Sequence, residues 1–259
     1  MLHEFCIQID GLCISNDDLN TNGKGHALLL WGHRREAAAR VGWYLHHYVR
    51  GADGLTPQAL QPTDNWTKSS LGPPGSIDLK HWEDSVVFAD SFADYGRWVE
   101  LWVDTARAQE AAGETKWVSQ TWSQVKLMTK YMLELHANAT QIGVGKGLIF
   151  GPAEHDTAQA EANWFSISAW TWRGFVQLHR FLTDTAAVSE PALAAQLVSE
   201  SVVFKADLDA ARDASLVKDA SGKPYFVPPF ASTNFTPYPS MTGGSGKEEN
   251  FGGGASCKK

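Results

Sequence analysis

Two long helical patterns with almost no residues between them constrain the fold most. Apolar residues recur at steps of three and four from Asp84 to Gly113, and Gly113 is a good helix stop. A second pattern starts at Glu114 and Thr115 and runs to Asn138. A turn this short makes its two helices antiparallel neighbours, so the chain contains at least one helical hairpin. The apolar positions of the first helix are Phe88, Phe92, Tyr95, Val99, Trp102 and Ala106.

Two further helical pairs flank this hairpin. A short apolar segment, residues 25–33, precedes a helical pattern over residues 34–50. The first helix of the third pair starts near Asn163 and reaches Leu182. The second helix begins at Ser189-Glu190-Pro191, where an N-cap is followed by an early proline. We therefore expect an all-α fold of about six helices in three hairpins, with long aromatic loops. Only short strands are expected, near residues 6–14, 54–59 and 148–150.

Length and composition indicate one domain. The chain has 259 residues, which is enough to bury a sizeable core. We assign residues 1–242 to a single domain and expect the Gly-rich tail, residues 243–259, to be disordered and without a role in the fold.

Charge and hydropathy exclude several partners. The net charge is −7 without a basic block, which argues against nucleic acid. No apolar run approaches the ~20 residues of a membrane span, and the N-terminus lacks the basic-then-apolar layout of a signal peptide. The three cysteines have no metal-ligand spacing, and neither a dinucleotide nor a phosphate-loop motif occurs. No metal or cofactor is predicted, and the compartment is left open.

Three phrases carry a family resemblance. DSFADYGRWVELWVDTAR, GLIFGPAEHDT and ADLDAARDASLVKDASGKPYFVPPF, together with tandem helical hairpins, resemble the six-hairpin, (α/α)6-toroid glycosidases. The resemblance implies a ring of inner and outer helices, an active site where the loops after the inner helices converge, and two carboxylates that act as acid and base. Since the chain supplies about half of such a ring, we expect a partial toroid that self-associates or lacks a complementary half.

The loop GLIFGPAEHDT holds the first candidate site. Glu154 and Asp156 point the same way in extended backbone, with His155 between them pointing oppositely. Apolar neighbours would help one carboxyl keep its proton for glycoside hydrolysis. The alternative is that either carboxylate caps the next helix or ties down the loop. We assign Glu154 and Asp156 as catalytic candidates and His155 as a substrate-binding one.

A second carboxylate group lies in FADSFADYGRW. Asp90 and Asp94 are four residues apart and share one helix face. Asp94 is the candidate catalytic partner of the loop carboxylates, and Asp90 a candidate substrate ligand. The alternative is an ordinary solvated face, with Arg97 close to Asp94.

Tryptophan is abundant, with eleven residues. A sugar ring packs its C–H face on an indole, so Trp66, Trp82 and Trp164, which lie on or beside loops, are candidate platforms. Asp64 would bind hydroxyl groups beside Trp66. Core packing is the alternative, and it is our prediction for the tryptophans inside helical stripes, which are Trp43, Trp102, Trp122 and Trp170.

These patterns predict a glycoside hydrolase-like protein that acts on an oligosaccharide or glycoside. The alternative is a catalytically inactive relative that binds carbohydrate, or a truncated fragment without activity. A purely structural scaffold of helical hairpins ranks last, because no repeat period is visible.

Overall fold

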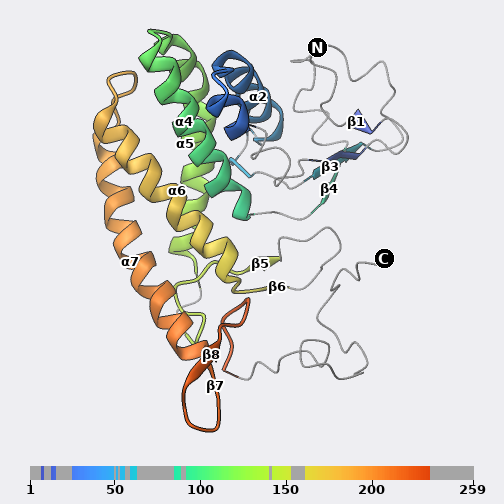
Figure 1. The fold of residues 1–259 in the computed structure, drawn as a ribbon, viewed down its shortest axis with the longest axis vertical. Coiled ribbons are helices and arrows are strands. Elements are labelled where there is room, and N and C mark those ends of the chain that lie inside the picture. Colours follow the sequence, from blue (N-terminus) through green and yellow to red (C-terminus); the bar gives the residue numbers. More distant parts are fainter. Residues whose placement is uncertain are drawn as a thin grey trace.

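The computed structural model is mostly helical, as expected from the sequence (Figure 1). It describes residues 7–8, 13–15, 25–49, 51, 53–55, 59–62, 85–88, 92–139, 142–152 and 161–233. The predicted tail, residues 243–259, lies outside them. Residues 25–30 are helical. The longer helices are α2 (Arg34–Tyr48), α4 (Phe92–Ala111), α5 (Thr115–Ala137), α6 (Phe165–Asp184) and α7 (Pro191–Ser215).

The strands are short and all pair antiparallel. A four-stranded sheet has the order β1 (Ile7–Gln8), β2 (Cys13–Ser15), β3 (Ala59–Pro62) and β4 (Ser85–Phe88). Two further pairs are β5 (Gly151–Pro152) with β6 (Glu161–Ala162), and β7 (Val217–Lys218) with β8 (Pro224–Phe226).

Strand β4 corrects one prediction. The helix expected from Asp84 begins only at Phe92, and Phe88 pairs with Ala59 in the sheet. The segment Ser85-Val86-Val87-Phe88 is rich in β-branched and aromatic residues, which fit a pleated surface better than a helix. The neighbouring strand β3 (Ala59–Pro62) shares only residue 59 with the strand predicted near 54–59, and no strand was predicted at its partner β4.

The hairpin of α4 and α5 is confirmed. Gly113 has φ +78° and reverses the chain between the two helices. The Trp102 indole N–H donates to the Thr121 hydroxyl at 2.8 Å, and the Tyr95 hydroxyl donates to Thr129 at 3.2 Å. The later α4 residue, Trp102, bonds the earlier α5 residue, Thr121, so the two helices are antiparallel.

Helices α4 and α6 are parallel. Gly96 lies against the backbone of Trp170 near their amino-terminal ends, and Arg107 is 4.0 Å from Asp184 near their carboxyl ends. The two backbones are so close at Gly96 that no side chain fits there. A Cβ on Gly96 would lie 1.9 Å from the Trp170 carbonyl oxygen. The closest approach of the two helices therefore depends on Gly96.

The other helices run in the opposite direction to α4 and α6. The Trp122 indole N–H donates to Glu190 at 3.2 Å, and His136 Nδ1 lies 3.0 Å from Glu200, so α5 and α7 are parallel. Helix α2 runs parallel to α5, because the Trp117 indole donates to the Ala38 carbonyl near the start of both. This alternation is what tandem hairpins produce. Closure of these hairpins into a toroid is not tested by the described residues and stays a prediction.

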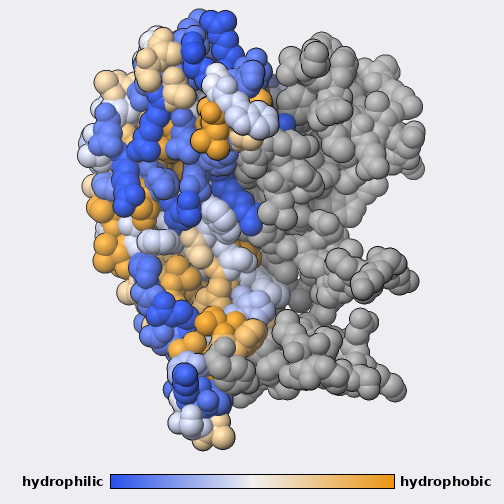
Figure 2. Space-filling model, viewed as in Figure 1, coloured by the Kyte–Doolittle hydropathy of each residue, from blue (hydrophilic) through white to orange (hydrophobic). Residues whose placement is uncertain are grey.

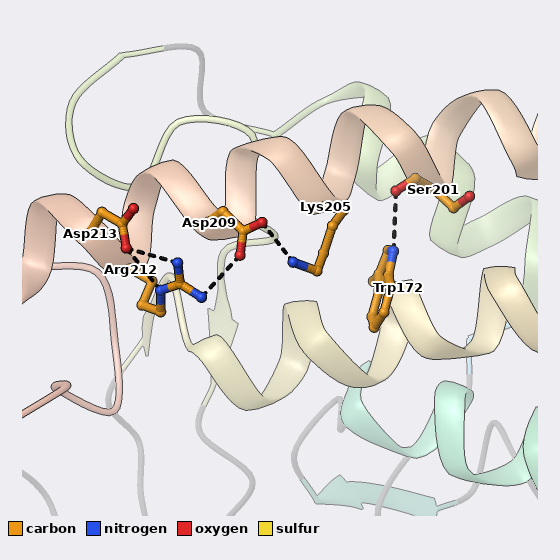
Figure 3. A network of polar contacts seen from close by, with 6 residues as sticks. All are labelled: Trp172, Ser201, Lys205, Asp209, Arg212 and Asp213. Atoms are coloured by element: carbon orange, nitrogen blue, oxygen red, sulfur yellow. Dashed lines mark hydrogen bonds and ion pairs between the residues drawn. The ribbon is translucent and has the colours of Figure 1, made fainter.

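A network of polar contacts lies along the seam between α6 and α7 (Figure 3). The Trp172 indole N–H on α6 donates to the Ser201 carbonyl on α7 at 3.1 Å, and the Lys205 ammonium lies 5.8 Å from the Trp172 ring centroid. Lys205 and Arg212 both contact Asp209 along the exposed side of α7. Such exposed i,i+3 and i,i+4 pairs contribute little stability, so burial supplies most of it at this seam.

The core lies between the helices and is rich in aromatic rings. Trp102 is fully buried, 5.0 Å from the Phe181 ring centroid, and Trp122 is 8% exposed. Core positions are therefore confirmed for these two predicted tryptophans. Trp43 and Trp170 are only partly buried and pack at the margin of the core. Trp98, which no prediction singled out, is 1% exposed and stacks on Tyr44.

Candidate functional site at the amino-terminal ends of α4 and α6

The candidate site is organised by the shared direction of α4 and α6. Because the two helices are parallel and touch at Gly96 and Trp170, their first turns lie at the same end of the molecule. Asp94 belongs to the first turn of α4. The loop that contains Glu154, His155 and Asp156 reaches α6 through β6, only two residues before Phe165. The described residues on either side of the acidic loop, Gly151–Pro152 and Glu161–Ala162, therefore connect to α6 at the end where α4 begins with Asp94 in its first turn, while the loop carboxylates themselves lie outside the described residues.

The acidic loop connects two short strands that pair as a β-hairpin. Gly151 pairs with Ala162 and Pro152 with Glu161, and the loop joins the two strands. Sequence analysis expected extended backbone near 148–150, and the paired strand starts one residue later. A hairpin, rather than a simple extended lead into α6, returns the chain to its starting point and holds both ends of the loop together.

The base of this hairpin is bonded to α6 and to the strand-like segment near Phe230. The Asn163 amide donates to the Leu148 carbonyl at 3.0 Å, and the Ile149 N–H donates to the Ser168 hydroxyl at 3.2 Å. The Ala231 N–H donates to the Asn163 carbonyl at 3.0 Å. Backbone groups on both sides of the hairpin base are therefore hydrogen-bonded, and these bonds attach the base to α6 and to the segment near Phe230.

Two aromatic side chains flank the hairpin base. Trp164 is partly buried and packs edge-to-face on Phe230, with 5.3 Å between ring centroids. Its indole N–H is buried and finds no acceptor among the described residues. Phe150 is 50% exposed, although Ile149 beside it is buried. Phe150, one of the apolar neighbours of the acidic loop, therefore presents an apolar surface to solvent.

Figure 2 shows where hydrophobic surface gathers on this face. Hydrophilic residues are frequent over the upper part of the view, and hydrophobic ones occur in separate patches, along the left margin over α7 and at the lower end near the end of α7 among them.

Several predicted site residues cannot be placed. Among the predicted site residues, Trp164 is the residue whose side chain the structure describes. For Asp94 the structure describes only the helical backbone. The others lie outside the described residues, and their assignments stay predictions. They are Asp64, Trp66, Trp82, Asp90, Glu154, His155 and Asp156.

Sequence reasoning missed a polar and aromatic cluster on the adjoining face of α4 and α6. The guanidinium carbons of Arg97 and Arg173 lie 4.9 and 5.3 Å from the Trp170 ring centroid, and Arg173 also forms an ion pair with Glu100. Trp170 was predicted as core because it sits in a helical apolar stripe. The spacing Arg97, Glu100 and Asp104 is the signal that could have found this face, since these positions share one side of a helix.

Asp104 extends this cluster along α4. Burial raises the pKa of the Asp104 carboxyl above its usual value, and His26, 3.6 Å away, opposes that shift. A carboxyl with a raised pKa is more readily protonated near neutral pH than an ordinary one. Asp104 lies about 15 Å along the helix from Asp94 at a rise of ~1.5 Å per residue, so it is far from the candidate site at the start of α4.

Within the described part of the chain, no group of three or more His, Cys, Asp or Glu side chains could hold a metal ion. None of the helices in that part is long and apolar enough to cross a membrane. Comparison with protein-family models, curated proteins and solved structures finds no match to this chain.

Proposed function

We propose that this protein binds a glycoside at the amino-terminal ends of α4 and α6 and hydrolyses it by acid/base chemistry between two carboxylates. One observation carries the proposal. The β5–β6 hairpin, which contains Glu154 and Asp156 in its loop, joins α6 at the end where Gly96 holds the first turns of α4 and α6 together. Asp94 is two residues from that contact.

This arrangement supports the chemistry because hydrolysis needs carboxyl groups from two sides of the scissile bond. One protonates the leaving oxygen, and the other acts on the opposite face of the sugar as base or nucleophile. A rigid helix turn carries Asp94, and a hairpin with a bonded base carries Glu154 and Asp156. The substrate would lie between these two elements.

Aromatic side chains support a sugar as the substrate class. Phe150 is half exposed immediately before the hairpin, and Trp164 lies immediately after it. An exposed ring contributes apolar contact to the C–H face of a pyranose, while nearby carboxylates accept bonds from its hydroxyl groups. The buried indole N–H of Trp164 has no acceptor in the described residues, so a ligand oxygen or water would satisfy it after a small movement.

The proposal is tested by combining binding and hydrolysis on the full chain. A glycan array identifies ligands, and hydrolysis of the bound glycans is followed by chromatography of the products. We expect Glu154→Gln or Asp94→Asn to reduce hydrolysis by about 100-fold or more while glycan binding survives. Asp213→Asn, which alters an exposed carboxylate on α7, is the matched control and should retain activity.

Each outcome has a distinct meaning. Binding without hydrolysis in the wild-type protein would establish the inactive carbohydrate-binding alternative instead of the enzyme. Hydrolysis that survives both substitutions would remove these carboxylates from the mechanism. A protein that binds no glycan and hydrolyses none would refute the proposal as a whole.

A further inference from the structure

A pocket lies at the opposite end of α4 from the candidate site. It is an open depression with a volume of about 510 Å³. Its position near Gln109 is about 22 Å along α4 from Asp94, at a rise of ~1.5 Å per residue. In Figure 1 this is the upper end, where α4 turns into α5 and α2 begins. The lining residues are Arg35, Ala38, Ala39, Gln109, Glu114 and Trp117.

A buried amide in this pocket has an unsatisfied acceptor. Gln109 is 1% exposed, and its side-chain nitrogen donates to the Arg34 carbonyl at 3.2 Å. The side-chain oxygen Oε1 is buried and has no hydrogen-bond partner. Leaving such an acceptor unpaired is costly, so a small movement of the Gln109 side chain that lets a donor from the pocket reach Oε1 would be favoured.

The remaining lining indicates the charge and shape of that donor. The Arg35 guanidinium lies 3.5 Å from the Glu114 carboxylate, so the charges that line the pocket balance. A cation would be repelled by Arg35 and an anion by Glu114, whereas a neutral hydroxyl can donate to Gln109 and accept from Arg35. Trp117 and Ala39 add apolar surface against which a ring can pack.

We propose that this pocket is a second ligand site, separate from the proposed catalytic one, that takes a single neutral sugar ring. One ring hydroxyl donates to Gln109 Oε1, a neighbouring hydroxyl contacts the Arg35–Glu114 pair, and the C–H face packs on Trp117. The inference does not depend on the proposed function, because it uses none of the residues at the amino-terminal ends of α4 and α6.

The test uses the full chain labelled with ¹⁵N at tryptophan indoles. The Trp117 signal is assigned with Trp117→Phe, and the protein is titrated with glucose, galactose, mannose, N-acetylglucosamine and glycerol. We expect at least one hexose to shift the Trp117 signal saturably, and glycerol, which has no ring face, to leave it unchanged. Gln109→Leu should weaken the binding by about tenfold or more.

Two matched substitutions keep the test independent of folding. Ala39→Phe fills the pocket from an exposed helix position and should abolish the shift, whereas Ala195→Phe, at an exposed position of α7, should preserve it. Glu154→Gln should also preserve it, which separates this site from the catalytic one. Titrations in which no hexose moves the Trp117 signal, in which glycerol moves it equally, or in which Ala39→Phe binds normally would overturn the proposal.

Discussion

Gly96→Ala is the sharpest test of how the candidate site is built. The added methyl carbon would lie 1.9 Å from the carbonyl oxygen and 2.4 Å from the carbonyl carbon of Trp170. Real Cβ atoms essentially never come within 3.0 Å of another heavy atom. The atoms it meets belong to backbone, so no side-chain rotation relieves the contact, and α4 and α6 must separate by about 1 Å.

The expected magnitude follows from two opposing effects. Overpacking in a close-packed interior costs about 1–3 kcal/mol, and a backbone contact this short belongs at the upper end. Alanine also favours the helix over glycine by about 1 kcal/mol. The net loss in the free energy of unfolding is therefore about 2 kcal/mol, which lowers the melting temperature by roughly 4–8 °C for a chain of this size.

Gly42→Ala is the matched control within α2. Its added Cβ would lie 3.5 Å from the Trp117 indole nitrogen, which is ordinary contact, so helix propensity should raise stability by about 0.5–1 kcal/mol. Urea unfolding followed by circular dichroism at 222 nm measures both variants. Opposite signs support the close approach of α4 and α6. A Gly96→Ala protein as stable as the wild type would refute it.

Three further substitutions test single interactions. Thr121→Val removes the buried acceptor of the Trp102 indole N–H, and urea unfolding should show a loss of about 1–3 kcal/mol; an unchanged midpoint would contradict the bond. Asp104→Asn removes a carboxyl whose pKa is raised by burial, so the folded wild type holds the extra proton and loses stability as pH rises from about 4. As the pH rises, the free energy of unfolding of the variant should therefore increase relative to that of the wild type. A difference between the two proteins that does not change with pH would exclude the raised pKa of Asp104. Glu190→Gln removes a carboxylate whose pKa is lowered by the hydrogen bond from Lys126, so it should cost about 0.5 kcal/mol at pH 7 and nothing once the pH is low enough to protonate folded Glu190. Equal losses at both pH values would mean that packing, not charge, accounts for the cost.

Helix positions were largely predictable from local pattern. The predicted ends of the α5 helix, residues 115 and 138, differ by at most one residue from Thr115–Ala137, and Gly113 has the positive φ that a helix stop uses. The false start at Asp84 shows the limit of this reasoning. Phe88 fits the helical spacing of Phe92 and Tyr95, but a hydrogen-bonded partner strand 25 or more residues earlier decides its conformation.

The site was predictable only in part. The acidic loop and the Asp90–Asp94 pair were recognisable as chemistry, and the resemblance proposed that they converge. The convergence that we propose would depend on the parallel packing of α4 and α6, which no local pattern contains. Trp170 shows the same limit. Its position in an apolar stripe predicted a core residue, but its indole lies at the margin of the core in contact with the guanidinium groups of Arg97 and Arg173.

The sequence by itself determined which segments are helices and where they turn, because periodicity, glycine and proline act over a few residues. Its net charge of −7 also argues against a nucleic-acid partner. Only tertiary structure decided that Gly96 brings α4 and α6 into contact, that a β-hairpin holds the acidic loop, and that Gln109 keeps an unpaired oxygen in a pocket. These features arise from contacts between residues tens of positions apart, and the energies of such contacts depend on distances that only the folded chain defines.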